Sequence, residues 1–189
     1  VFEQGFRPAI TEVGLRHPVT AGLEGTALPG EEPKWGRWFR MIEANQTGGD
    51  AVMSGIDDKP LLVLDRVGEG RVAQLLSDHA WLWARGYEGG GPQAELLRRL
   101  AHWLMKEPDL EEEDLRATST GDQITIERQS LFEDDVKVQV TNPDGSVREV
   151  ALEDIGGGRA RATIAAEDPG LYRINDFIRV TVVAQGAVN

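Results

Sequence analysis

The spacing of apolar residues changes once along this chain of 189 residues, near residue 108. Before that point the strongest pattern is helical, and after it short runs alternate apolar and polar residues. All five tryptophans also lie before residue 109. A chain with such a break is expected to fold as two units. We therefore predict an α/β segment at 1–108, an acidic linker at 109–120 and a small all-β domain at 121–189.

The first segment contains two short apolar runs, at 61–64 and 72–76, on either side of a turn that contains glycine. This pattern predicts a β-hairpin, and the nearly continuous apolar character favours a sheet that is covered on both faces. After Pro92, leucines recur at helical spacing up to Glu107, which predicts a helix whose apolar stripe lies on that sheet. Residues 35–42 are a further candidate strand.

The second segment contains six short runs of β-type residues, separated by turn residues. Such a series predicts an antiparallel sandwich of the immunoglobulin-like kind. The expected strands cover residues 123–128, 136–141, 147–152, 159–165, 171–174 and 177–183. The expected core residues are Val136, Val138, Val140, Ile164, Leu171 and Tyr172.

Charge excludes one class of partner. The chain carries 32 acidic and 20 basic residues, a net charge of -12. Of this, 1–108 contributes 15 acidic and 12 basic residues (net -3), and 109–189 contributes 17 and 8 (net -9). Such a field repels a phosphate backbone, so we expect no nucleic acid partner. No apolar run reaches the roughly 20 residues of a membrane helix, so we expect no direct membrane insertion of these residues.

Several motifs resemble those of a known family. Residues 60–64, 68–72 and 100–104 are similar to the closing segment of class I glutamine-amidotransferase-like domains, which have a flavodoxin-like α/β fold. Residues 17–23 (HPVTAGL), 35–40 (WGRWFR) and 81–86 (WLWARG) resemble large bacterial membrane proteins in which such a domain follows membrane helices. Residues 140–145 and 169–173 are similar to the immunoglobulin-like modules of the same proteins. The resemblance implies a piece of a larger protein.

The resemblance also implies a cysteine nucleophile, and the chain has no cysteine. Ser77, Asp78 and His79 are consecutive, so their side chains diverge and cannot align as a catalytic triad. The sequence around Ser77 also lacks the G-x-S-x-G elbow motif of hydrolases. His79 follows a strand and precedes Trp81, Trp83 and Arg85, a combination found at binding surfaces, although tryptophans also close cores. These four residues are our candidate binding site, and we predict no catalytic residue.

We predict no metal site and no cofactor. No histidine has a second histidine at ligand spacing, and the glycine-rich turns lack the lysine that grips phosphates. The acidic clusters at 57–58, 111–114 and 133–135 lack the alternating pattern of a calcium loop, so we read them as solvated surface.

Three hypotheses for function follow. The first is a non-catalytic binding or scaffolding module, on the periplasmic or extracytoplasmic side of a membrane-anchored bacterial protein, that contacts a protein partner or other domains of the same protein. The second is a fragment of an amidotransferase-like hydrolase whose nucleophile lies outside this chain and to which His79 contributes a base. The third is a structural spacer.

Overall fold

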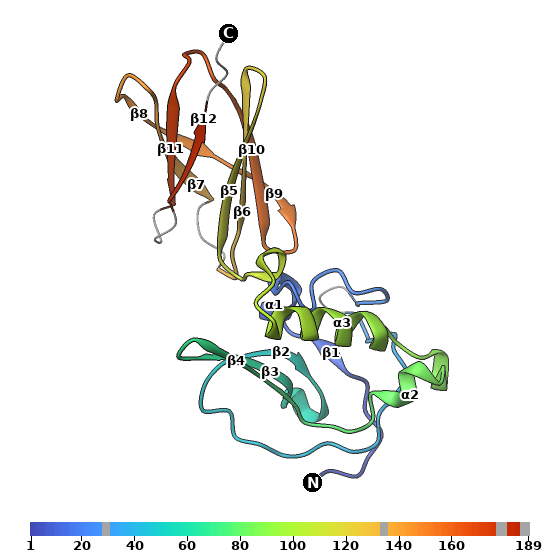
Figure 1. The fold of residues 1–189 in the computed structure, drawn as a ribbon. Helices are drawn as coiled ribbons and strands as arrows, with labels where there is room; N and C mark the ends of the chain where they lie inside the picture. The colour runs from blue at the N-terminus through green and yellow to red at the C-terminus, as the bar shows by residue number, and fades with distance from the viewer. Residues whose placement is uncertain (28–30, 133–135, 177–180, 186–189) are drawn as a thin grey trace. The chain divides into compact units, whose positions relative to one another are not determined.

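The computed structural model describes residues 1–27, 31–132, 136–176 and 181–185, the last of these as backbone together with the side chain of Ala184. The chain divides into two compact units, Val1–Glu111 and Glu112–Asn189 (Figure 1). Across the described residues the fold is mostly β, with three antiparallel sheets of four strands each. All helices among the described residues belong to the first unit.

Unit 1 contains one sheet with the strand order β1-β2-β3-β4. Its strands are β1 (Ala9–Ile10), β2 (Asp50–Ser54), β3 (Pro60–Val67) and β4 (Gly70–Leu75). Its α-helices are α1 (Glu12–Arg16), α2 (Trp81–Ala84) and α3 (Gln93–Leu104). Three 3-10 turns complete the unit, η1 (Ile56–Asp58), η2 (Tyr87–Gly89) and η3 (Pro108–Leu110).

The predicted hairpin is confirmed, because β3 and β4 pair in register up to Val67 and Gly70 on either side of a two-residue turn. The predicted covering of both sheet faces is wrong for β4, where exposed and half-buried residues alternate, although Leu61, Leu62 and Leu64 of β3 are buried. The candidate strand at 35–42 forms only isolated bridges to residues near the amino terminus. All three strand pairs are antiparallel, whereas a flavodoxin-like sheet is mainly parallel.

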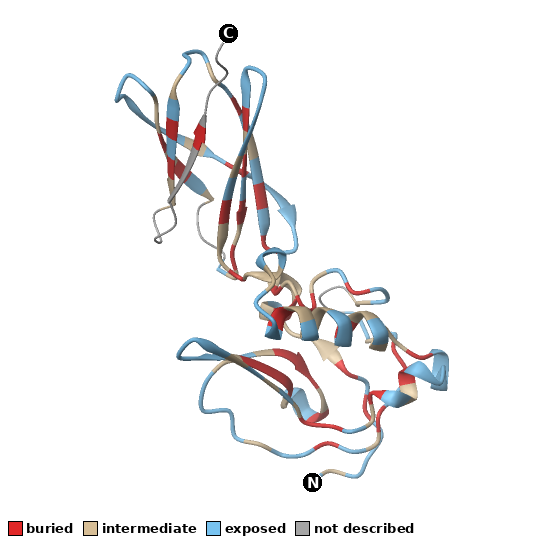
Figure 2. Ribbon diagram, in the orientation of Figure 1, coloured by how far each residue is buried: buried red, intermediate tan, exposed pale blue. Residues whose placement is uncertain are grey.

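The predicted helix is confirmed as α3, but its apolar stripe is split between two environments. Leu96 and Trp103 are buried in the core of unit 1. Leu97 and Leu104 were expected on the sheet, yet they are 39% and 40% exposed. Apolar residues span about half of the helix circumference, and only one part of that arc faces the core, so that buried and exposed colours alternate along α3 in Figure 2.

Unit 2 contains two antiparallel sheets, ordered β5-β6-β10-β9 and β12-β11-β7-β8. The strands are β5 (Asp114–Thr120), β6 (Gln123–Gln129), β7 (Lys137–Thr141), β8 (Val147–Ala151), β9 (Glu153–Gly156), β10 (Arg159–Ala165), β11 (Leu171–Asp176) and β12 (Thr181–Gln185). Buried side chains from both sheets form one apolar core, as in a β-sandwich. Of the last predicted strand, 177–183, residues 177–180 lie outside the described residues.

Four of the six expected core residues of unit 2 are buried, namely Val138, Val140, Ile164 and Tyr172, and Val136 packs against them. The expectation for Leu171 is wrong, because it is 62% exposed. Neighbouring residues of a strand point to opposite faces, so the burial of Tyr172 turns Leu171 outward.

The predicted linker at 109–120 is also wrong over most of its length, because residues 114–120 form β5. Leu115 faces the core and Ala117 packs against it, while Arg116 and Thr118 face outward. The acidic residues before β5 conceal this alternation in the sequence. The connection between the two units is therefore shorter than the composition indicates.

Candidate functional site

Two tryptophan-rich segments that are far apart in the sequence, 35–40 and 81–86, pack together in unit 1. The Trp83 indole Nε1–H donates a hydrogen bond to the Gly36 carbonyl oxygen at 2.8 Å. The Trp83 ring lies 5.1 Å from that of Trp35 and 4.7 Å from that of Trp38, measured between centroids. These aromatic contacts fix helix α2 against the first segment.

Gly36 is required for this packing. Its N–H donates to the Gly90 carbonyl oxygen at 2.8 Å, which joins the segment to the loop after α2. A Cβ atom at position 36 would lie 2.1 Å from the Tyr87 carbonyl oxygen. Only a residue without a side chain allows the two backbones to approach so closely.

The candidate residue His79 belongs to the same contact. Its Nδ1 accepts a hydrogen bond from the Phe39 backbone N–H at 3.0 Å. A neutral imidazole that accepts at Nδ1 carries its proton on Nε2. Nε2 lies 3.8 Å from an Asp78 carboxylate oxygen, and the His79 side chain is 17% exposed. One ring nitrogen is therefore occupied by the backbone and the other is a donor at the surface.

Ser77 has no hydrogen bond to the His79 ring among the described contacts. Its hydroxyl donates to the Arg40 carbonyl oxygen at 2.7 Å and accepts from the His79 backbone N–H at 3.1 Å. The hydroxyl thus joins two backbone segments, and Ser77 is 6% exposed. Ser77 is thus connected to the backbone of His79 and not to its imidazole ring among these contacts.

The exposed side of this contact is a continuous set of aromatic rings, Trp81, His79, Phe39 and Tyr87, which we call the aromatic row. Ring centroids are 6.4 Å apart for His79 and Trp81, 6.5 Å for Phe39 and His79, and 5.7 Å for Phe39 and Tyr87. Trp81 is 53% exposed and Tyr87 is 41% exposed. Large apolar rings therefore remain in contact with water on one face of unit 1.

Exposed arginines accompany the aromatic row. Arg37 lies over the Phe39 ring, with 5.6 Å from its guanidinium carbon to the ring centroid, and donates to both carboxylate oxygens of Glu88. This hydrogen bonding lowers the pKa of Glu88 to about 2 and raises the pKa of Arg37. Arg40 contacts the Asp78 carboxylate at 3.0 Å. Arg85, at the end of α2, is exposed.

The four sequence candidates therefore have different positions. His79 and Trp81 belong to the aromatic row and Arg85 is exposed, but Trp83 is 2% exposed and cannot contact a partner. Trp81 and Trp83 are two residues apart on α2, so they point in nearly opposite directions, because each helical residue is rotated by about 100°. Phe39 and Tyr87 were not predicted as site residues. The WGRWFR motif was the available signal for Phe39.

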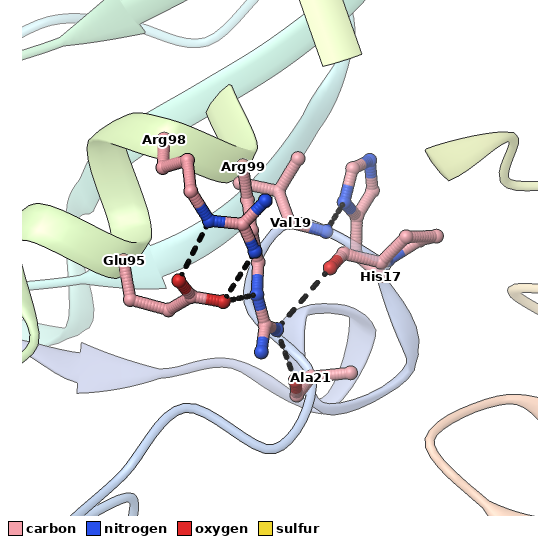
Figure 3. Close-up of polar contacts among 7 residues, drawn as sticks. His17, Val19, Ala21, Glu95, Arg98 and Arg99 are labelled. Carbon is pink, nitrogen blue, oxygen red and sulfur yellow. Dashed lines mark hydrogen bonds and ion pairs between the residues drawn. The ribbon is translucent and has the colours of Figure 1, made fainter. Parts of the chain in front are cut away.

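A second polar cluster explains the HPVTAGL motif (Figure 3). His17 is buried, accepts from the Val19 N–H through Nδ1 at 3.1 Å, and packs edge-on against Trp103. Arg99 of α3 donates to the Ala21 carbonyl oxygen at 2.6 Å, and Glu95 pairs with Arg99 at 2.6 Å. The motif thus forms a turn that is hydrogen-bonded to α3 through Arg99.

The acidic run at 111–114 is not simply solvated surface. Glu111 accepts hydrogen bonds from Arg66 at 2.7 Å and from Arg71. Glu112 is 7% exposed, and Glu113 accepts from the Ser130 hydroxyl at 3.0 Å. Within the described residues, no group of three or more metal-ligating side chains comes together. The acidic cluster at 133–135 lies outside the described residues.

Comparison with known proteins adds no further constraint. No family model matches the sequence, and no curated protein or solved structure is found to be similar to it. Among the described helices, none combines the length and the apolar character needed to cross a bilayer.

Proposed function

We propose that this chain is a non-catalytic binding module and that the aromatic row, with Arg37, Arg40 and Arg85, is its recognition surface. The observation that carries the proposal is the exposure of Trp81 and Tyr87 at the two ends of a contiguous row of rings. Tryptophan, tyrosine and arginine are the residues most enriched at the energetic centres of protein interfaces. The partner is accordingly a protein or another domain of the same protein.

The state of His79 supports a binding role over a catalytic one. A general base needs a ring nitrogen with a free lone pair directed at the substrate. The Nδ1 lone pair already accepts the Phe39 N–H, and Nε2 carries the proton of the neutral ring. His79 can therefore donate a hydrogen bond to a partner, but it offers no free base.

The wider setting of the proposal comes from the family resemblance. Unit 1 would be the closing segment of an amidotransferase-like domain, and unit 2 an immunoglobulin-like module that mediates contacts. The whole would lie on the periplasmic or extracytoplasmic side of a membrane-anchored bacterial protein. The two-sheet core of unit 2 supports the second of these assignments.

Site-specific photo-cross-linking tests the recognition surface. A benzophenone amino acid at position 81 should give one discrete protein adduct in bacterial cells that produce the protein. The same amino acid at Leu171, which is a 62% exposed apolar position in unit 2, is the control. Tyr87→Ala should reduce the adduct at position 81, since it removes the other end of the row. Equal adducts at both positions, or none at position 81, would contradict the proposal.

The hydrolase hypothesis has its own test. Purified protein and the His79→Ala variant are assayed for glutamine and ester hydrolysis. We expect no turnover in either sample. Turnover that survives purification and disappears in the variant would show that residues 77–87 form an active site.

A further inference from the structure

The strand β4 ends the sheet of unit 1 with an open edge. Leu76 N–H donates to the Leu61 carbonyl oxygen at 2.8 Å, which fixes the residues whose backbone groups face β3. Because backbone groups alternate along an antiparallel strand, Arg71, Ala73 and Leu75 turn their N–H and C=O groups away from β3. Nothing in the described part of the chain hydrogen-bonds to these outward groups.

Three common protections against strand pairing are missing at this edge. Natural edge strands are blunted by proline, by a bulge or by being very short. β4 is six residues long, contains no proline and pairs with β3 without a register shift. It is therefore a regular template for another strand.

Helix α3 packs on this edge strand, and its two flanks differ (Figure 1). On one flank Arg99 reaches the carbonyl oxygens of Pro18 and Ala21. The turn at 17–21 follows α1, and α1 packs on β1 and β2. This flank of α3 therefore faces the β1 side of the sheet.

The other flank of α3 is apolar and exposed. At about 100° per residue, Ala94, Leu97, Ala101 and Leu104 lie on the side of the buried stripe opposite to Arg99. We call these four residues the α3 seam. Leu97 and Leu104 are 39% and 40% exposed, and both alanines are exposed. The seam thus lies on the same side of unit 1 as the open edge of β4.

We propose that the β4 edge and the α3 seam together form a two-fold interface with a second copy of this chain. An antiparallel pairing of β4 with its own copy would satisfy the outward groups of Arg71, Ala73 and Leu75. A two-fold axis makes the same surface meet itself, so the surface must be self-complementary.

The α3 seam meets this requirement. When two copies of α3 run antiparallel about an axis near residue 99, Leu97 lies opposite Ala101 of the second copy, and Ala94 lies opposite Leu104. Every large side chain then meets a small one, which is the arrangement that lets helix surfaces interdigitate. A seam with leucine at all four positions would not be self-complementary in this way.

Charge and size limit the strength of the contact with a second copy. Arg98 flanks the seam and would approach its own copy, but it pairs with both Glu95 carboxylate oxygens at 2.9 and 2.8 Å. Glu95 also pairs with Arg99, so these three side chains together keep one positive charge, and the pairing offsets only part of the like-charge repulsion. The six residues of β4 and the four residues of the α3 seam are about half of the roughly 20 residues per side at the low end of stable interfaces. We expect a weak dimer.

Sedimentation equilibrium of the 1–189 chain over a concentration series tests this inference. We expect the mass of two chains at concentrations on the order of 100 µM, and a dissociation constant raised at least about tenfold by Leu97→Glu. Leu171→Glu, which places the same change at an exposed leucine of unit 2, should leave the constant unchanged. Tryptophan fluorescence melting verifies that each variant is folded.

A mixing experiment tests the antiparallel register. Ala101→Lys changes an exposed residue and should weaken the dimer as Leu97→Glu does. In an equimolar mixture of the two variants, the glutamate of one copy would face the lysine of the other, so the dimer should return. A monomer at all concentrations, or a dimer that neither variant weakens, would overturn the inference. The β4 edge would then be available to a strand of another protein. Failure of the mixture to dimerise would overturn the proposed register.

Discussion

Replacing Trp83 is the most direct test of how the candidate site is built. Trp83 is 2% exposed, contacts the rings of Trp35 and Trp38, and donates to the Gly36 carbonyl oxygen at 2.8 Å. Truncating a buried tryptophan to alanine costs about 3–5 kcal/mol, because transfer energy is lost and a cavity remains. We expect Trp83→Ala to lower the free energy of unfolding of unit 1 by about this amount.

A second variant separates the hydrogen bond from the packing. Trp83→Phe keeps an aromatic ring but removes the Nε1–H donor, which leaves the Gly36 carbonyl oxygen without that partner. An unsatisfied buried acceptor costs about 1–3 kcal/mol. We therefore expect Trp83→Phe to be destabilising by less than Trp83→Ala.

Urea unfolding followed by tryptophan fluorescence is a suitable measurement, because all five tryptophans lie in unit 1. The signal therefore reports on that unit even where the two units unfold separately. Trp81→Ala is the control, since Trp81 is 53% exposed and surface changes usually stay within about 0.5 kcal/mol. An equal loss of stability for Trp81→Ala and Trp83→Ala would refute the assignment of one tryptophan to the scaffold and the other to the surface.

Two further predictions concern ion pairs. Asp176→Ala should destabilise unit 2 by about 3–5 kcal/mol, since it leaves Arg128 buried without its ion pair at 2.6 Å. Calorimetry measures this loss in the unfolding transition of unit 2, which is the transition without a change in tryptophan fluorescence. An unchanged transition would contradict the prediction. Glu88 has a folded pKa of about 2, below its usual 4.5, so its pairing with Arg37 stabilises unit 1 above about pH 4.5 and is lost as the pH falls towards 2. Glu88→Gln should remove part of the acid sensitivity of unit 1 in fluorescence melts, whereas an acid profile identical to that of the parent chain would show that the pair adds no stability.

The elements that could be predicted from sequence are those with strong local periodicity. The hairpin of β3 and β4, the helix α3 and the alternating strand β7 depend on residues that are close together in the chain. β5 was not predicted, because the acidic residues before Leu115 resemble a linker. β9 was missed because all four of its residues are exposed and show no alternation.

The candidate site could be predicted only in part, since its geometry depends on contacts between distant segments. His79 and Trp81 were identified from their position after a strand. Nothing local in the sequence distinguishes the buried Trp83 from the exposed Trp81, because the difference depends on the segment that covers one side of α2. The pairing of Arg37 with Glu88 spans 51 positions and is fixed by the close approach of Gly36 to the loop after α2.

The way the site is built bears on how it can bind. Flexible aromatic side chains lose rotamer freedom when a partner orders them, and this loss reduces affinity. Here Phe39 is held through its backbone by the His79 ring, and its own ring contacts those of His79 and Tyr87. Tyr87 lies in the loop that Gly36 and the Arg37–Glu88 pair attach to the first segment. The aromatic row is thus ordered before any partner arrives, so a large part of its ring surface can contribute to affinity, and loosening the loop should weaken binding even when every exposed ring is kept.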